Sequence, residues 1–221
     1  MGYEIGREIR DILLALALAL AALYTGGLAA AYTGLSNIWS SQLALLAVAL
    51  FLSRTRMLDP GLREIKGVYT GLILGPIATL SAIIASLLWS NLFPQTTAAR
   101  QLTVALTPSS TAEYLLYLGL TLFVVAPAEE IIFRGIVHRK LSRFMRKGFA
   151  DIVSSMVFAA AHSDLSRIGP TFVLGLFLAH SVDRTRSLTP AIIIHAINNT
   201  AYITLLFLSS SAFAAENLIL P

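Results

Sequence analysis

Apolar residues gather in seven stretches of the chain, and each stretch ends where charged or turn-forming residues begin. The stretches cover residues 12–33, 41–53, 68–94, 112–137, 150–163, 170–182 and 189–209. A membrane-spanning helix needs about 20 apolar residues, so three of the stretches are short, and we expect seven or eight spans. The pattern predicts an all-α, polytopic membrane protein whose residues 1–221 form a single membrane domain.

Two polar segments separate the early stretches and are expected to be loops. The first is "TRMLDPGLREIKG", which contains Pro60 and Gly61, and the second is "NLFPQTTAARQ", which contains Pro94. The stretch that begins at residue 12 follows the charged segment "EIGREIRD" and is longer than the 7–15 residues typical of a signal peptide. We therefore expect it to be a retained first helix.

The positions of lysine and arginine predict the orientation of the spans. If the N-terminus is cytoplasmic, thirteen basic residues lie inside and two, Arg100 and Arg167, lie outside. The thirteen are Arg7, Arg10, Arg54, Arg56, Arg63, Lys66, Arg139, Lys140, Arg143, Arg146, Lys147, Arg184 and Arg186. This bias favours a multi-pass protein of the cell membrane with a cytoplasmic N-terminus.

The composition narrows the class of protein further. Charged residues make up 13% of the chain, against about 25% in a soluble domain. The absence of cysteine excludes disulfides, thiolate nucleophiles and cysteine metal ligands. The net charge of +4 comes with no nucleic-acid motif, and the basic residues adjoin apolar stretches, so the expected partner is the lipid bilayer.

Three groups of polar residues interrupt the apolar stretches at similar depths. Helical geometry places Glu129 ~14 Å, and His162 and His195 each ~12 Å, from the same membrane face. Charged residues inside a membrane are costly and usually functional, so we expect the groups to meet in one site. Their members are Glu129, Glu130, Arg134, His162, His195, Asn198 and Asn199.

Spacing predicts which of these side chains are neighbours. Glu130 and Arg134 are four residues apart and can pair on one helix face, whereas Glu129 points about 100° away. His195 and Asn199 are also four residues apart. A Glu–Arg pair could simply hold two helices together, and a single intramembrane histidine is often only a hydrogen-bond donor between helices.

The combination of residue types suits hydrolysis. A carboxylate that arginine does not neutralise can act as a general base for water, and a histidine can orient that water. A histidine and an amide can donate hydrogen bonds to a developing oxyanion. Alternatively, Glu129, His162 and His195 could bind zinc and leave one coordination position for water.

The same residues resemble the ABI or CPBP family of intramembrane proteases, which includes the type II CAAX prenyl endopeptidases. The family motifs EExxxR, FxxxH and HxxxN match "EEIIFR" at 129–134, "FAAAH" at 158–162 and "HAINN" at 195–199. The resemblance covers a motif-bearing core at about residues 112–208. It implies helices around a cytoplasm-facing cavity, and cleavage of a peptide or lipidated peptide near the cytoplasmic membrane face.

The resemblance also implies a role for each motif residue. Glu129 and His162 would activate water, His195 and Asn199 would form the oxyanion hole, and Glu130 and Arg134 would support the site. Family members are also described as metalloproteases. We expect no cofactor, because one available carboxylate makes a sparse zinc site, and a zinc-dependent version remains the alternative.

Other functions are compatible with the same residues. Some family members are linked to bacteriocin processing or self-immunity, and a non-catalytic immunity or binding protein could keep the fold. Intact Glu129, His162 and His195 argue against the loss of catalysis. A proton-coupled transporter would also use buried ionisable residues, but the chain is short and has no detectable repeat.

Overall fold

The computed structural model describes residues 2–33 and 36–219, and every regular element within them is helical. The elements are α1 (Gly2–Thr33), α2 (Asn37–Ser53), η1 (Pro60–Arg63), α3 (Val68–Ser90), α4 (Thr97–Leu106), α5 (Thr111–Leu120), η2 (Thr121–Val125), α6 (Ala126–Glu130), η3 (Ile131–His138), α7 (Arg139–Leu141), α8 (Lys147–Ala161), α9 (Leu165–Thr185) and α10 (Thr189–Ile219). The expected all-α class is confirmed.

Five helices of the described chain are long and apolar enough to cross a membrane. They occupy residues 4–32, 68–90, 111–141, 165–185 and 189–210. The other two expected spans are shorter helices, α2 with 17 residues and α8 with 15 residues. The polytopic membrane fold is therefore confirmed, while the number of complete spans stays a prediction.

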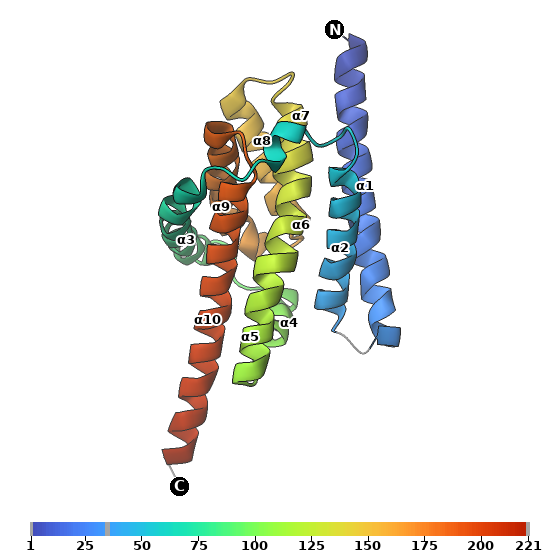
Figure 1. Cartoon of the computed structure of the whole chain (residues 1–221). Helices are drawn as coiled ribbons and strands as arrows, with labels where there is room; N and C mark the ends of the chain where they lie inside the picture. The colour runs from blue at the N-terminus through green and yellow to red at the C-terminus, as the bar shows by residue number, and fades with distance from the viewer. Residues whose placement is uncertain (1, 34–35, 220–221) are drawn as a thin grey trace.

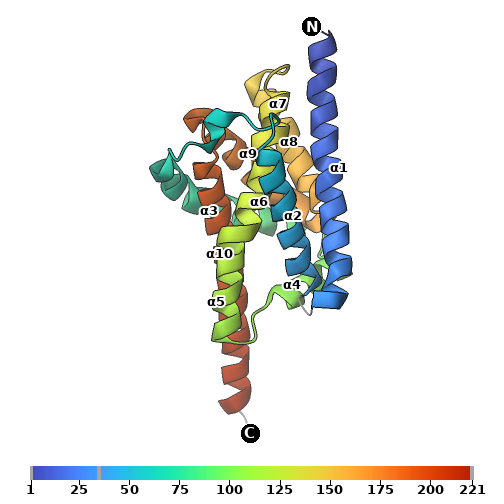
Figure 2. The ribbon, with the colours of Figure 1, turned by 45° about the vertical axis from the view of Figure 1, so that its right-hand side comes forward.

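The segment from α5 to α7 lies at the centre of the bundle (Figure 1). The turned view shows the same order, with α1 and α2 side by side and α10 running along α5 and α6 (Figure 2). The central segment contacts α1, α2, α8, α9 and α10, while α3 packs on α9 and α10. Residues 111–141 are thus surrounded by the helices that carry the other polar groups.

Two expectations about loops are wrong. Residues 97–106, expected in part as loop, form α4, which Thr96 caps by accepting a hydrogen bond from the backbone of Ala99 at 3.1 Å. Residues 164–169 separate two of the predicted apolar stretches, but α9 begins among them at Leu165. Asp164 caps that helix by accepting from the backbone of Ser166 at 3.0 Å, and Pro170 lies inside the helix.

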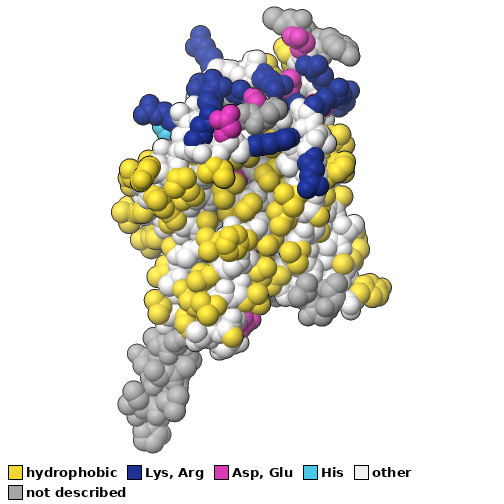
Figure 3. Space-filling view, viewed as in Figure 1, with side chains coloured by type: hydrophobic (Ala, Val, Ile, Leu, Met, Phe, Trp, Pro, Cys, Tyr) yellow, Lys and Arg dark blue, Asp and Glu magenta, His cyan; other side chains and the backbone are white. Residues whose placement is uncertain are grey.

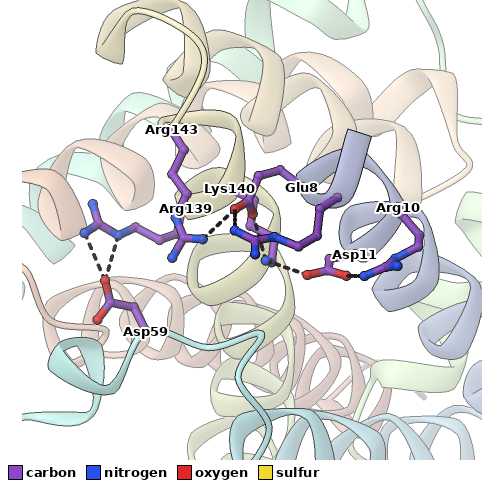
Figure 4. A network of polar contacts seen from close by, with 8 residues as sticks. Glu8, Arg10, Asp11, Asp59, Arg139, Lys140 and Arg143 are labelled. Atoms are coloured by element: carbon purple, nitrogen blue, oxygen red, sulfur yellow. Dashed lines mark hydrogen bonds and ion pairs between the residues drawn. The ribbon is translucent and has the colours of Figure 1, made fainter. Parts of the chain in front are cut away.

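Lysine and arginine side chains gather at the end of the bundle that carries α7 and the start of α1 (Figure 3). We call this the basic end. The segment "HRKLSRFMRK" is rich in basic residues, but Lys140 within it is buried and lies 2.8 Å from both Glu8 and Asp11 of α1 (Figure 4). Arg143 pairs with Glu8, and Arg139 pairs with Asp59. The pairs with Glu8 and Asp11 fix α1 to the α7 region, and the pair with Asp59 ties α7 to the loop before η1.

His138, the last residue of η3, is fully buried. Its Nε2 atom lies 2.7 Å from Oδ1 of Asp151 in α8, and Asp183 of α9 is 4.0 Å away. Lys147 pairs with Asp183 at 3.3 Å. This cluster ties η3, α8 and α9 together at the basic end, away from the motif residues.

Candidate active site

The two adjacent glutamates lie on α6, a short α-helix between two π-helical segments. The segment η2 precedes it and η3 follows it. A π-helical turn is rare and occurs mostly where function requires an altered helix register. Glu129 and Glu130 are therefore presented from an irregular part of an otherwise continuous helix, and both are buried.

Glu130 forms the expected ion pair with Arg134. Nε of Arg134 lies 3.2 Å from Oε2 of Glu130, and Nη1 donates to Oε1 at 3.3 Å. The two side chains are 0% and 1% exposed. The same Oε1 atom lies 2.7 Å from Nδ1 of His195 in α10. Glu130 thus connects the first motif to the third, a contact that the sequence spacing did not predict.

Arg134 makes two further contacts that the sequence analysis missed. Its Nη2 atom donates to the carbonyl of Gly175 in α9 at 3.3 Å. Its guanidinium carbon lies 4.1 Å from the ring centre of Phe158 in α8, within the range of a cation–π contact. A side chain on Gly175 would collide with Ser155, so α8 and α9 pack closely beside this arginine.

Phe158 also contacts the rings of both histidines. Its ring centre lies 4.9 Å from that of His162 and 5.7 Å from that of His195, in edge-on arrangements. The family motif FxxxH marks this position, but the sequence alone does not show that one aromatic ring contacts the arginine and both histidines.

All four residues expected to be catalytic line one cavity of about 150 Å³. We call it the catalytic cavity. Its wall combines the ends of α2 and α4, the η2–α6 segment, α10 and the residues around His162. The members are Ile38, Trp39, Gln42, Leu102, Leu106, Thr121, Val125, Glu129, His162, Arg167, His195, Asn199, Tyr202 and Ile203.

Glu129 presents one oxygen to this cavity without a fixed partner. Its Oε1 atom accepts a long hydrogen bond from Nε2 of Gln42 at 3.5 Å. Its Oε2 atom is buried, has no hydrogen bond among the described residues, and lies 3.9 Å from Nε2 of His195. Gln42 was missed because it comes from α2, 87 residues earlier in the chain.

His162 and Asn199 are each held by a neighbouring residue. Nδ1 of His162 lies 2.9 Å from the carbonyl of Phe158, so it donates there and leaves Nε2 free. Asn198, expected as a neighbour of the site, donates from Nδ2 to Oδ1 of Asn199 at 3.4 Å. The amide nitrogen of Asn199 is then free to donate within the cavity.

The donor atoms of the three expected zinc ligands are not gathered around one point. Glu129 and His195 approach each other, but within the described residues the only group of three His, Asp or Glu ligand atoms lying within 4.8 Å of one another is His138, Asp151 and Asp183. Zinc ligands bind at about 2.0–2.2 Å, so their donor atoms must lie close together. In the arrangement of the described residues, the donor atoms of Glu129, His162 and His195 do not all lie within 4.8 Å of one another.

The catalytic cavity is lined in part by Leu102 and Leu106 of α4, and α4 lies in the half of the bundle away from the basic end (Figures 1 and 2). Toward the basic end, Ile132, Ile136, Leu178 and Ile194 are fully buried and close the core. If the basic end is cytoplasmic, this cavity is not reached straight from the cytoplasm, which differs from the arrangement that the resemblance implies.

Comparison with known families gives one match. The model of the type II CAAX prenyl endopeptidase Rce1-like family matches residues 111–201, a segment that begins at α5 and ends within α10. It contains all three motifs and both sides of the Glu130–His195 contact. No curated protein and no solved structure matches the chain.

Proposed function

Because residues 111–201 match the model of the Rce1-like family of type II CAAX prenyl endopeptidases, we propose that this protein is an intramembrane endopeptidase in which Glu129 activates water. The family match supports a CAAX-type intramembrane protease at the family level. The observation that carries the glutamate mechanism is the buried Oε2 atom of Glu129, which accepts no hydrogen bond from the described residues, on a side chain that lines a cavity with His162, His195 and Asn199.

Charge balance separates the roles of the two glutamates. Arg134 neutralises Glu130, so Glu130 serves to hold Arg134 and His195 in place. Glu129 has only the amide of Gln42 as a hydrogen-bond donor, and an amide does not remove its negative charge. A carboxylate in this state can accept a proton from water.

The contact with Glu130 determines which proton His195 offers to the cavity. Nδ1 of His195 donates to ionised Glu130, so Nε2 of the neutral ring can only accept. A second proton on Nε2 makes the ring a donor on both sides, toward Glu130 at 2.7 Å and toward Glu129 at 3.9 Å. In this state, two carboxylates face Arg134 and one imidazolium.

In the proposed reaction, each of these residues has one role. A water molecule held by Nε2 of His162 gives a proton to Glu129, and its oxygen attacks the carbonyl carbon of the scissile peptide bond. Nε2–H of His195 and the amide of Asn199 donate to the oxyanion. The proton on Glu129 passes to the leaving amine as the C–N bond breaks.

The test compares purified wild-type protein with Glu129→Gln, using a farnesylated peptide that ends in a C-a-a-X box. The substitution keeps the shape of the side chain and removes the base. General-base catalysis is worth about 10²–10⁴-fold, so we expect cleavage to fall by that factor while the peptide still binds. Full activity of Glu129→Gln would sink the proposal.

The zinc alternative is tested on the same preparations. Elemental analysis and treatment with a strong chelator are expected to leave the activity of the wild type unchanged. Stoichiometric zinc, together with activity that a chelator removes and added zinc restores, would replace the metal-free mechanism.

A further inference from the structure

A second cavity, of about 240 Å³, lies beside the catalytic cavity and shares part of its wall. We call it the side cavity. Both cavities are lined by Leu102, Arg167, Asn199 and Tyr202. The two cavities therefore adjoin at these four residues.

Arg167 is a half-buried cation on this shared wall. Within residues 2–33 and 36–219, its guanidinium makes no ion pair and no hydrogen bond. A buried or partly buried charge is normally paired, because desolvation without a partner is costly. Its position in the third residue of α9 adds the positive end of the helix dipole. The wall between the cavities is thus ready to receive an anion.

Asp164, a carboxylate near Arg167, already accepts hydrogen bonds at both of its oxygens. Oδ1 of Asp164 accepts from the backbone and hydroxyl of Ser166 at 3.0 and 2.8 Å, and Oδ2 accepts from Thr96 at 3.2 Å. Asp164 therefore serves as a cap for α9 and a link to α4. Arg167 acts on it through space but does not form an ion pair with it.

The lining of the side cavity favours a peptide over a lipid tail. Hydroxyl and amide side chains occur all around it, namely those of Thr79, Ser86, Ser90, Gln95, Thr171 and Asn198. Oγ1 of Thr79 is buried without a hydrogen-bond partner among the described residues. A hydrocarbon chain would leave such groups unpaired at a cost, whereas a peptide backbone offers both donors and acceptors.

We infer that the side cavity binds the leaving segment of the substrate and that Arg167 binds a carboxylate on that segment. This inference rests on the proposed function. The carboxylate is either the C-terminus of the substrate or an acidic side chain just after the scissile bond. Since Arg167 lines both cavities, the carboxylate lies close to the cleaved bond, and Arg167 selects substrates with a short leaving segment.

The experiment uses three forms of one fluorescent, farnesylated C-a-a-X peptide: the free acid, the C-terminal amide, and the amide with glutamate as its last residue. Binding is measured with Glu129→Gln protein in detergent, and cleavage is measured with protein that keeps Glu129. A hydrogen bond to a charged group is worth roughly a factor of ten or more. We expect the free acid to bind at least about ten-fold more tightly than the amide, and the same ratio to appear in KM.

Arg167→Gln is expected to bind the acid and the amide equally, with the affinity for the amide unchanged. Arg167→Lys should keep part of the preference, because it keeps the charge but not the two-pronged geometry. Arg100→Gln is the matched control, since Arg100 is exposed on α4 at the same end of the bundle and should keep the full preference.

The outcomes separate this inference from the proposed function. Equal binding of all three peptides by protein that retains Arg167, or a preference that survives in Arg167→Gln, overturns the carboxylate site even if cleavage is normal. A preference that depends on Arg167 without any cleavage supports the site and contradicts the protease. Tighter binding of the glutamate-containing amide than of the free acid assigns the carboxylate to a side chain.

Discussion

Nδ1 of His195 and Oε1 of Glu130 lie 2.7 Å apart, and both residues are almost completely buried. The two residues are 65 positions apart in the sequence. Because the same oxygen also accepts from Arg134, one carboxylate fixes the orientation of an arginine and of an imidazole. The second glutamate of the motif is therefore the structural centre of the site.

Replacement of Arg134 by alanine is expected to reduce stability before it affects chemistry. The change leaves Glu130 buried without its ion-pair partner, and breaking a buried pair typically costs about 3–5 kcal/mol. It also removes the contacts with Gly175 and Phe158. We expect a low folded yield and a lower Tm in detergent, measured by size-exclusion chromatography and thermal unfolding.

Lys66→Ala serves as the control for Arg134→Ala. Lys66 pairs with Glu64 at 2.6 Å, but both side chains are about half exposed or more, so the pair contributes little. Wild-type yield and Tm in Arg134→Ala would contradict a structural pair and favour a direct contact between Arg134 and the substrate.

Replacement of Asn199 by alanine is expected to lower turnover while the fold remains intact. The removal of one oxyanion donor typically costs about 10²–10³-fold in kcat. Asn198→Ala is the informative comparison, because Asn198 donates to Oδ1 of Asn199 and does not line the catalytic cavity. We expect it to have a smaller effect on kcat, measured under the same conditions. A larger loss in Asn198→Ala than in Asn199→Ala would reverse the two roles.

Replacement of Lys140 by methionine is expected to destabilise the contact between α1 and α7. Glu8 and Asp11 are buried around the ammonium group at 2.8 Å each, and they would repel each other without it. We expect a loss of about 3–5 kcal/mol in the free energy of unfolding. The triple change with Glu8→Gln and Asp11→Asn should restore part of the loss. A triple variant no more stable than Lys140→Met would show that the repulsion is not the cause.

The orientation is tested with single cysteines, since the chain has none. Gly148→Cys places a thiol at the basic end, where an added side chain meets open space, and Gln101→Cys places one on exposed α4. From the positive-inside bias, an impermeant reagent added outside intact cells should label Gln101→Cys only. Labelling of Gly148→Cys alone would reverse the orientation and place the opening of the cavity in the cytoplasm.

The sequence pattern predicts well what depends on short distances along the chain. The ion pair of Glu130 and Arg134 follows from their spacing of four residues, and the structure contains this pair. Seven apolar stretches all correspond to helices. The start of α9 was misplaced because Pro170 looks like a helix boundary, although a proline in the first turns of a helix removes few hydrogen bonds.

What the pattern misses depends on contacts between distant segments. Lys140 lies in a run of basic residues with no nearby carboxylate, so its burial against Glu8 cannot be seen without the packing of α1. Gln42 is one polar residue in an apolar stretch and gains meaning only when α2 lies beside α6. From the sequence, Arg167 was only one of the two basic residues expected outside the membrane, because nothing in the sequence places it on the wall of a cavity.

The two short helices have a consequence for the lipid around the protein. At ~1.5 Å per residue, the 17 residues of α2 span ~26 Å and the 15 residues of α8 span ~23 Å, less than a hydrocarbon core of about 30 Å. If both helices cross the membrane as the sequence predicts, the bilayer must thin next to them or leave polar ends in hydrocarbon. His162 stands at the end of α8, so headgroups and water come nearer to this histidine than its depth in an undistorted bilayer would allow. The thickness of the membrane would then affect how much water reaches the cavity.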